Sequence, residues 1–242
     1  LLQRAKAEGF DVDRLGLFFP KCDLVHAHDA RSHTLALRLR PPLVVSRRVA
    51  FPIRSRSKYR GATHFIAVSD YVANVLKSGG VPESKISVVP DGVPLLRLTA
   101  AGEKILIPAQ KQTPLAVEAA RLTGLPVCVS EDLEADLANA RFLLYATECE
   151  GLGSGVLLAM SAGVPAIASN VGGLREIIVD GENGLLVENS VEAIASAVRR
   201  LAGNPDLAGR IAVNARLTIE TRFSEARMVA DTIEVYRRVL NA

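Results

Sequence analysis

The sequence predicts an α/β protein made of two doubly wound halves, and three observations support this prediction. Short apolar runs bounded by turn residues alternate with helical patterns along the chain, which is typical of parallel sheets covered by helices. The alternation breaks once, between residues 94 and 102, and restarts at Lys104. A strand–loop–helix–strand unit with a glycine-rich loop then occupies residues 142–176.

Composition supports a chain with a large core and excludes several functions. The chain has 242 residues, of which 49% are hydrophobic and 5% aromatic, and tryptophan is absent. A low content of aromatic rings argues against stacked recognition of single-stranded nucleic acid. We therefore expect no nucleic-acid partner. The three cysteines lack C-x-x-C spacing, which predicts no metal site and a reducing, cytoplasmic location. No signal peptide and no apolar run of membrane-spanning length is expected.

Charge is divided unevenly along the chain. The first 100 residues carry 16 basic and 8 acidic side chains, whereas the rest carry 13 and 18. Six basic residues and no acidic residue fall within residues 47–60. A basic first half predicts an anionic partner, such as a phosphorylated acceptor or the inner face of a membrane.

The first half has the following predicted elements, in chain order. Strands are expected at residues 23–28, 43–46, 64–69 and 86–89, and helices at 1–8, 30–39 and 70–76. Residues 47–60 lack a helical pattern. His26 and His28 alternate along the first strand, so we expect them to face opposite ways, with His28 nearer the strand end. Asp29 fits a helix cap.

The second half continues the same alternation. Strands are expected at 104–107, 126–129, 142–146 and 166–169, and helices at 114–122, 132–138, 156–162, 191–201, 205 onward and 225–240. Asn189 and Glu192 fit a capping box, and Ser224 fits the cap of the last helix. Residues 94–102 are the predicted linker.

The glycine-rich loop has a physical rationale. Gly151, Gly153 and Gly155 let the backbone turn sharply and let a ligand approach it closely. The amides that open the next helix carry positive partial charge, and Glu150 just before them can accept hydrogen bonds from sugar hydroxyls. The alternative is that Glu150 only complements the helix dipole. The G-x-G-x-G spacing, with no acidic residue after the next strand, excludes a dinucleotide fingerprint.

These motifs resemble the donor-binding half of glycosyltransferase family 4, retaining enzymes of the GT-B fold. The segments that resemble it are Glu150-Gly-Leu-Gly, Ala159-Met-Ser-Ala-Gly-Val-Pro165, Ser169-Asn-Val-Gly-Gly173 with Glu176, and Gly181-Glu-Asn-Gly-Leu-Leu-Val187. In the first half, Asp23-Leu-Val-His-Ala-His-Asp29, Ile66-Ala-Val-Ser69 and Val88-Val-Pro-Asp-Gly-Val93 look like the end of an acceptor domain. The resemblance implies a GT-B-like fold with a cleft between two Rossmann-like halves.

The resemblance also implies domains and site residues. The expected domains are an incomplete acceptor-side domain at 1–97, a nucleotide-sugar domain at 98–224, and a helix at 225–242 that crosses back to the first domain. The expected catalytic residues are Glu150, His28 and Arg48. The expected donor-binding residues are Lys111, Gly151, Leu152, Gly153, Ser154, Gly155 and Leu158. An acceptor or phosphate is expected to meet Arg47, Arg54 and Arg56. The alternative for Arg47 and Arg48 is a solvated basic edge, and the alternative for Lys111 is a solvated side chain.

Two departures from the family pattern bear on activity. The family has a second glutamate eight residues after the first, which holds the ribose, and here that position is Leu158. The first strand and its glycine-rich loop have no counterpart in the sequence, which opens inside a helical pattern without methionine. The first half is therefore expected to be shortened.

The main hypothesis is a retaining glycosyltransferase that uses a UDP- or GDP-linked sugar as substrate and needs no cofactor or metal. Its acceptor would be a glycan or a lipid-linked molecule, as in lipopolysaccharide synthesis, with peripheral membrane association. The first alternative is a transferase-like binding protein that has lost turnover, and a lower-ranked one is a nucleotide-sugar epimerase. The oligomeric state is left open.

Overall fold

The structure is a computed structural model that describes residues 6, 21–96, 102–111 and 113–241. The chain divides into two compact units, and each has a parallel sheet covered by helices, which confirms the predicted α/β class. Unit 1 is Leu1–Pro90 with Glu225–Ala242, and unit 2 is Asp91–Ser224. The predicted helix over residues 1–8 falls, apart from Lys6, outside the described residues.

Unit 1 has a four-stranded parallel sheet in the order β1-β2-β3-β4. Its strands are β1 (Val25–Ala27), β2 (Leu43–Arg47), β3 (His64–Ala67) and β4 (Ile86–Val88). Its helices are α2 (Ala30–Ala36), α3 (Arg56–Arg60), α4 (Asp70–Ser78), the short 3₁₀ turn η1 (Glu83–Lys85) and α11 (Glu225–Leu240). All four strands predicted for this half are present.

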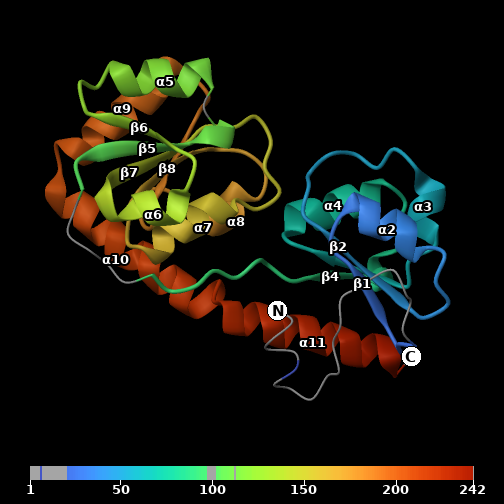
Figure 1. Cartoon of the computed structure of the whole chain (residues 1–242). Coiled ribbons are helices and arrows are strands. Elements are labelled where there is room, and N and C mark those ends of the chain that lie inside the picture. Colours follow the sequence, from blue (N-terminus) through green and yellow to red (C-terminus); the bar gives the residue numbers. More distant parts are fainter. Residues whose placement is uncertain (1–5, 7–20, 97–101, 112, 242) are drawn as a thin grey trace. The chain divides into compact units, whose positions relative to one another are not determined.

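The last helix, α11, packs on one face of this sheet. Val44, Ile66 and Val89 form a buried cluster with Val235, Tyr236 and Val239 of α11. Figure 1 shows α11 on one face of the sheet and α2, α3 and α4 on the other. Residues 225–240 are thus part of the same unit as the first strands.

Helix α3 was not predicted, and packing explains it. Its five residues show no apolar period and Ser55 makes no side-chain cap. The Tyr59 ring, however, stacks on Phe65 of β3 with ring centroids 5.4 Å apart and meets His33 edge-on at 5.3 Å. The Tyr59 hydroxyl also accepts a hydrogen bond from Arg47 Nη1 at 2.6 Å. The interpretation of residues 47–60 as wholly non-helical is therefore wrong for 56–60.

Unit 2 has a five-stranded parallel sheet in the order β6-β5-β7-β8-β9. Its strands are β5 (Lys104–Pro108), β6 (Val127–Ser130), β7 (Ala140–Tyr145), β8 (Ala166–Ser169) and β9 (Leu185–Val187). Its helices are α5 (Pro114–Arg121), α6 (Leu133–Asp136), α7 (Ser154–Ser161), α8 (Leu174–Ile177), α9 (Val191–Ala202) and α10 (Pro205–Arg222), with 3₁₀ turns η2 (Ala109–Lys111) and η3 (Leu137–Asn139). Strand β9 and helix α8 were not predicted.

The alternation of side chains along β7 divides the core of unit 2 between two layers. Phe142 and Leu144 belong to a buried cluster with residues of α5, α9 and α10. Leu143 and Tyr145 point to the opposite face, as the period of two requires. Figure 1 shows α5 and α9 on one side of this sheet and α6, α7 and α8 on the other. Tyr145 therefore lies under α7, the helix that follows the glycine-rich loop.

One predicted helix cap and one predicted helix start differ from the structure. Helix α9 is capped by Ser190, whose Oγ accepts a hydrogen bond from Ala193 N at 3.1 Å, so the predicted capping box of Asn189 and Glu192 is wrong. Asn189 instead bonds to a neighbouring strand, as described below. Helix α7 begins at Ser154, two residues before the predicted start, because Gly153 takes a left-handed conformation (φ 113°) as its N-cap.

The division between the units falls between Pro90 and Asp91, earlier than the expected 97/98 boundary. Hydrogen bonds explain the difference. Val93 N donates to Phe223 O at 3.0 Å, and Arg216 Nη1 donates to Leu96 O at 2.6 Å. Residues 91–96 are therefore held by α10 and its C-terminal end, within unit 2.

Candidate functional site

The topology of unit 2 defines where a ligand site is expected. The chain runs from β5 outward to β6, then returns to β7 on the other side of β5 and continues to β8 and β9. Ligands of such sheets bind outside the carboxyl ends of the strands where the order reverses. In this sheet the reversal lies between β5 and β7. Lys111 follows β5 in η2, and Glu150 follows β7.

Lys111 and Glu150 form an ion pair at this point. Lys111 Nζ lies 2.8 Å from Glu150 Oε2, and their side chains are 19% and 17% exposed. The same Nζ donates to Thr147 Oγ1 at 3.2 Å and lies 4.9 Å from the centre of the Tyr145 ring. Lys111 is thus a paired, mostly buried cation, so the alternative of a solvated lysine is wrong.

Two further groups donate hydrogen bonds to the Glu150 carboxylate. The Tyr145 hydroxyl donates to Oε2 at 2.8 Å, and the Gly151 amide donates to Oε1 at 3.0 Å. Burial, followed by the Glu150 charge, raises the pKa of Tyr145 far above its ordinary value, so its hydroxyl keeps its proton. Hydrogen bonds to both of its oxygens therefore fix the orientation of the Glu150 carboxylate.

A second polar network lines the ends of β7, β8 and β9. Ser169 Oγ accepts a hydrogen bond from Thr147 N at 2.8 Å and donates to Asn189 Oδ1 at 2.6 Å. Asn189 Nδ2 donates to Thr147 O at 3.0 Å. These bonds fix both backbone groups of Thr147, the residue whose hydroxyl meets Lys111.

Two glycines let the neighbouring loop lie directly against the backbone of Glu150 and Gly151. A Cβ at Gly172 (φ 50°) would be 2.2 Å from Glu150 O, and one at Gly173 would be 2.1 Å from Gly151 O. Gly173 N also donates to Glu150 O at 3.1 Å. Only glycine fits at these two positions, so the Gly172-Gly173 pair packs directly against the backbone that carries the Glu150 side chain.

The remaining predicted donor residues lie around the start of α7. Gly151, Leu152 and Gly153 are buried, whereas Ser154 is exposed. A Cβ at Gly155 would be 3.1 Å from Tyr145 Cε2, so this glycine leaves room for the tyrosine ring. Leu158 is only partly buried, while Leu157 and Ala159 are fully buried. Leu158 is one helical turn beyond Ser154, on the less covered face of α7, so it is not a fully buried core residue.

In unit 1, the predicted residue His28 lies just beyond the end of β1. Its ring centroid is 3.9 Å from that of His26, so the two rings do not face opposite ways. The strand ends at Ala27, and side-chain alternation ends with it. Burial and then the charge of Arg48 lower the pKa of His28 below its ordinary value. A neutral imidazole and an exposed Arg48 therefore lie near each other at the carboxyl end of β1 and β2.

His26 is a structural residue of unit 1. Its Nδ1 is 2.6 Å from the Tyr236 hydroxyl of α11, and its Nε2 is 2.8 Å from Ser46 Oγ of β2. Both ring nitrogens of this partly buried histidine therefore have hydrogen-bond partners within unit 1.

The three arginines predicted to meet an acceptor or a phosphate differ in their surroundings. Arg47 is partly buried, and it donates to the Tyr59 hydroxyl and to Phe51 O. Its guanidinium thereby ties β2 to the loop that follows it. Arg54 and Arg56 are exposed. Their ligand contacts stay predictions.

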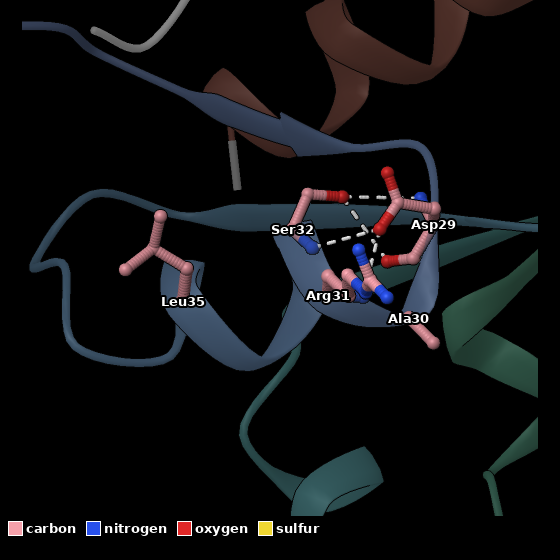
Figure 2. A pocket seen from close by; sticks show the side chains of 5 residues that line it. All are labelled: Asp29, Ala30, Arg31, Ser32 and Leu35. Carbon is pink, nitrogen blue, oxygen red and sulfur yellow. Dashed lines mark hydrogen bonds between the residues drawn. The ribbon is translucent and has the colours of Figure 1, made fainter.

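A shallow depression lined by Asp29, Ala30, Arg31, Ser32 and Leu35 lies at the start of α2 (Figure 2). The Asp29 carboxylate accepts bonds from Arg31 N at 2.7 Å and Ser32 N at 2.9 Å, which confirms Asp29 as the helix cap. The amides of this helix start are thus already occupied, and the depression belongs to a different unit from the Lys111–Glu150 pair.

Sequence reasoning missed four residues of the unit 2 site, namely Tyr145, Thr147, Ser169 and Asn189. Tyr145 has a detectable signal, because it is the one residue with a polar side-chain atom in the apolar run 142–146. Asn189 fits a helix cap in the sequence, and only strand β9, which ends at Val187, brings it beside Thr147 and Ser169. Among residues 21–96, 102–111 and 113–241, no three His, Cys, Asp or Glu side chains converge as metal ligands, and no helix there is long and apolar enough to cross a membrane.

Solved structures with a similar architecture include a glycosyltransferase and a protein bound to UDP and glucose. A glycosyltransferase from Rickettsia africae superposes with a TM-score of 0.75 at 20% identity, over 90% of this chain and 77% of that one. HepE from Anabaena, solved with UDP and glucose, gives a TM-score of 0.76 at 16% identity, over 89% and 78%. The two parallel-sheet halves are thus those of the GT-B fold.

Sequence comparisons identify the family. Residues 86–204 match the model described as "Glycosyl transferases group 1", and residues 10–97 match "Glycosyltransferase Family 4". The putative glycosyltransferase EpsD of Bacillus subtilis is 32% identical over 176 residues, covering 71% of this chain and 45% of that protein. The alpha-maltose-1-phosphate synthase of Mycolicibacterium smegmatis is 39% identical over 110 residues, covering 43% and 28%.

The two family matches together run from residue 10 to residue 204, and the chain belongs to glycosyltransferase family 4. It spans less than half the length of these two curated relatives.

Proposed function

We propose that this chain transfers a sugar from a UDP- or GDP-linked donor to an acceptor, with retention of the anomeric configuration. Unit 2 binds the donor. Lys111 neutralises the diphosphate, and Glu150 accepts hydrogen bonds from the sugar hydroxyls. In unit 1, His28 and Arg48 serve the reacting sugar and the leaving phosphate, and the acceptor is a glycan or a lipid-linked molecule of the cell envelope. No metal or cofactor takes part.

The observation that carries this proposal is the Lys111–Glu150 pair at the reversal of the unit 2 sheet. A leaving diphosphate needs fixed positive charge, and a sugar needs fixed hydrogen-bond acceptors. A cation and a carboxylate 2.8 Å apart supply both at one place. The start of α7 adds the positive end of a helix dipole beside them. The Anabaena neighbour was solved with UDP-glucose, which supports a nucleotide-linked donor.

One relative supports a glycan acceptor of the cell surface, and another supports a phosphorylated acceptor. The capsular polysaccharide biosynthesis glycosyltransferase CapM of Staphylococcus aureus is 30% identical over 103 residues, covering 42% of this chain and 27% of that protein. The D-inositol 3-phosphate glycosyltransferase of a Nocardioides strain is 32% identical over 136 residues, covering 54% and 30%.

The test is donor hydrolysis and transfer with UDP- and GDP-sugars, followed by proton NMR of the released sugar. We expect release of nucleoside diphosphate and, initially, a sugar with the donor's anomeric configuration. Release of the opposite anomer would overturn retention. Interconversion of one nucleotide-sugar into another would favour the epimerase.

A second candidate function is a donor-binding protein without turnover, and Leu158 is the observation that favours it. Leucine accepts no hydrogen bond, so ribose hydroxyls at this position are left to water. We expect calorimetry to give dissociation constants weaker than about 100 μM for UDP and GDP, or about −5.5 kcal/mol.

The exchange Leu158→Glu should tighten nucleotide binding by about tenfold, because hydrogen bonds to a charged group contribute roughly 1.5–3 kcal/mol each. Leu158 lies on the less covered face of α7, where a carboxylate stays hydrated. Leu158→Gln is the matched control and should have a smaller effect. Low-micromolar binding by the natural chain, weakened by Leu158→Glu, would contradict this assignment.

The basic segment 47–60 should attract an anionic acceptor or membrane surface. Arg48, Arg54 and Arg56 are exposed there, and Phe51 beside them is 64% exposed. We expect co-sedimentation with anionic liposomes that weakens between about 50 and 500 mM salt, since surface attraction is screened. Arg54→Ser with Arg56→Ser should reduce it. Equal binding to neutral and anionic vesicles at all salt concentrations would exclude this surface.

A further inference from the structure

The Tyr145 hydroxyl is a buried polar group that the proposed reaction does not use. Tyr145 is 6% exposed and ends strand β7, five residues before Glu150. Its hydroxyl donates to Glu150 Oε2 at 2.8 Å. Its ring lies under the first turn of α7, where Gly155 leaves it space. The ring is therefore fixed by packing, and its hydroxyl has a fixed direction.

Lys111 is the second partner of the same oxygen. Its long side chain reaches Glu150 Oε2 and Thr147 Oγ1 from a short 3₁₀ turn. A lysine ammonium is a flexible point charge with three rotatable donors, and a diphosphate attracts it more strongly than one carboxylate does. Under the proposed function Lys111 neutralises the diphosphate, so a bound donor competes with Glu150 for the Lys111 ammonium.

We propose that Tyr145 is the positioning residue that holds the Glu150 carboxylate toward the sugar once Lys111 has moved to the diphosphate. This inference rests on the proposed function. The Tyr145 bond to Oε2 and the Gly151 bond to Oε1 then orient both oxygens without any mobile group. The ring's burial keeps the hydroxyl from turning to water.

The test is a double-mutant cycle of Tyr145→Phe and Glu150→Gln, since Tyr145→Phe keeps the ring and removes only the hydroxyl. Without substrate, Tyr145→Phe should lower the melting temperature by about 2–4 °C, and by clearly less in the Glu150→Gln background. Tyr236→Phe is the matched control, because it removes another hydrogen-bonded tyrosine hydroxyl, that of the bond to His26. Its shift should be the same in the natural chain and in the Glu150→Gln background.

With a donor sugar, Tyr145→Phe should lower kcat about five- to tenfold and leave KM for the donor within about twofold. In the Glu150→Gln background it should change kcat less than about twofold. Additive melting shifts, or a kcat equal to that of the natural chain, would overturn the inference. A natural chain that neither binds nor hydrolyses UDP- and GDP-sugars would overturn the proposed function instead, while the melting cycle still decides the Tyr145–Glu150 contact.

Discussion

Replacing Glu150 by glutamine is expected to lower sugar transfer or donor hydrolysis ten- to a hundredfold, about 1.4–2.7 kcal/mol of transition-state stabilisation. The amide keeps the shape of the side chain but loses the charge. Its NH₂ group also cannot accept the bonds that Lys111 and Tyr145 donate to Oε2. The reaction rate with a UDP- or GDP-sugar, measured at saturating donor, is the test.

The matched control is Glu148→Gln. Glu148 lies in the same loop and is exposed, and its exchange should leave the rate within about twofold. Circular dichroism of both variants should match that of the natural chain, because the backbone of the loop is held by Gly172 and Gly173. Unchanged kinetics in a folded Glu150→Gln variant would contradict the assignment of Glu150.

Acidification is expected to destabilise unit 1 through His33. His33 is 2% exposed, and its Nε2 has no hydrogen-bond partner among the residues that the structure describes. Burial, followed by the charge of Lys58, lowers its pKa to about 4. Above pH 6.5 the imidazole is neutral in both the folded and the unfolded chain. Between pH 6.5 and about 4 only the unfolded chain gains the proton, so stability falls as pH falls.

The free energy of unfolding is expected to fall by about 2 kcal/mol between roughly pH 7.5 and 5. The whole fall, once His33 is protonated in the folded chain too, is about 3 kcal/mol, because the pKa is lowered by roughly 2.5. His33→Leu should remove the pH dependence that His33 causes. The difference in unfolding free energy between the natural chain and the variant should therefore change by about 2 kcal/mol from about pH 7.5 to 5. Urea unfolding followed by tyrosine fluorescence suits this test, because three of the four tyrosines lie in unit 1 and tryptophan is absent.

The His33→Leu variant also separates the effect of His33 on acid stability from the effects of the other histidines. The pKa values of His26, His28 and His64 are lowered as well, so the natural chain's stability has further acid dependence that His33→Leu retains. A stability difference between the two chains that stays constant from about pH 7.5 to 5 would show that His33 titrates normally in the folded chain.

Much of the fold could be predicted from local sequence because parallel strands are short, apolar and bounded. The strand at 166–169 has its predicted bounds, and the others differ by only a few residues. The sequence does not predict helix α3 and strand β9, because tertiary contacts rather than a local pattern form them. Helix α3 depends on Tyr59 packing against Phe65, and β9 is three residues long and pairs with β8. Neither contact produces a regular spacing of apolar residues in the sequence.

The sequence by itself determined the α/β class, the two halves and the family, and it singled out Lys111 and Glu150, the charged residues of the proposed donor site. It did so because strand period, glycine spacing and the motif around Glu150 are local. Only the tertiary structure decided that these two side chains pair, that Tyr145 and Thr147 join them, and that Leu158 is not a core residue. Residues 111 and 150 follow different strands, and sheet order, which no local pattern encodes, brings their side chains together.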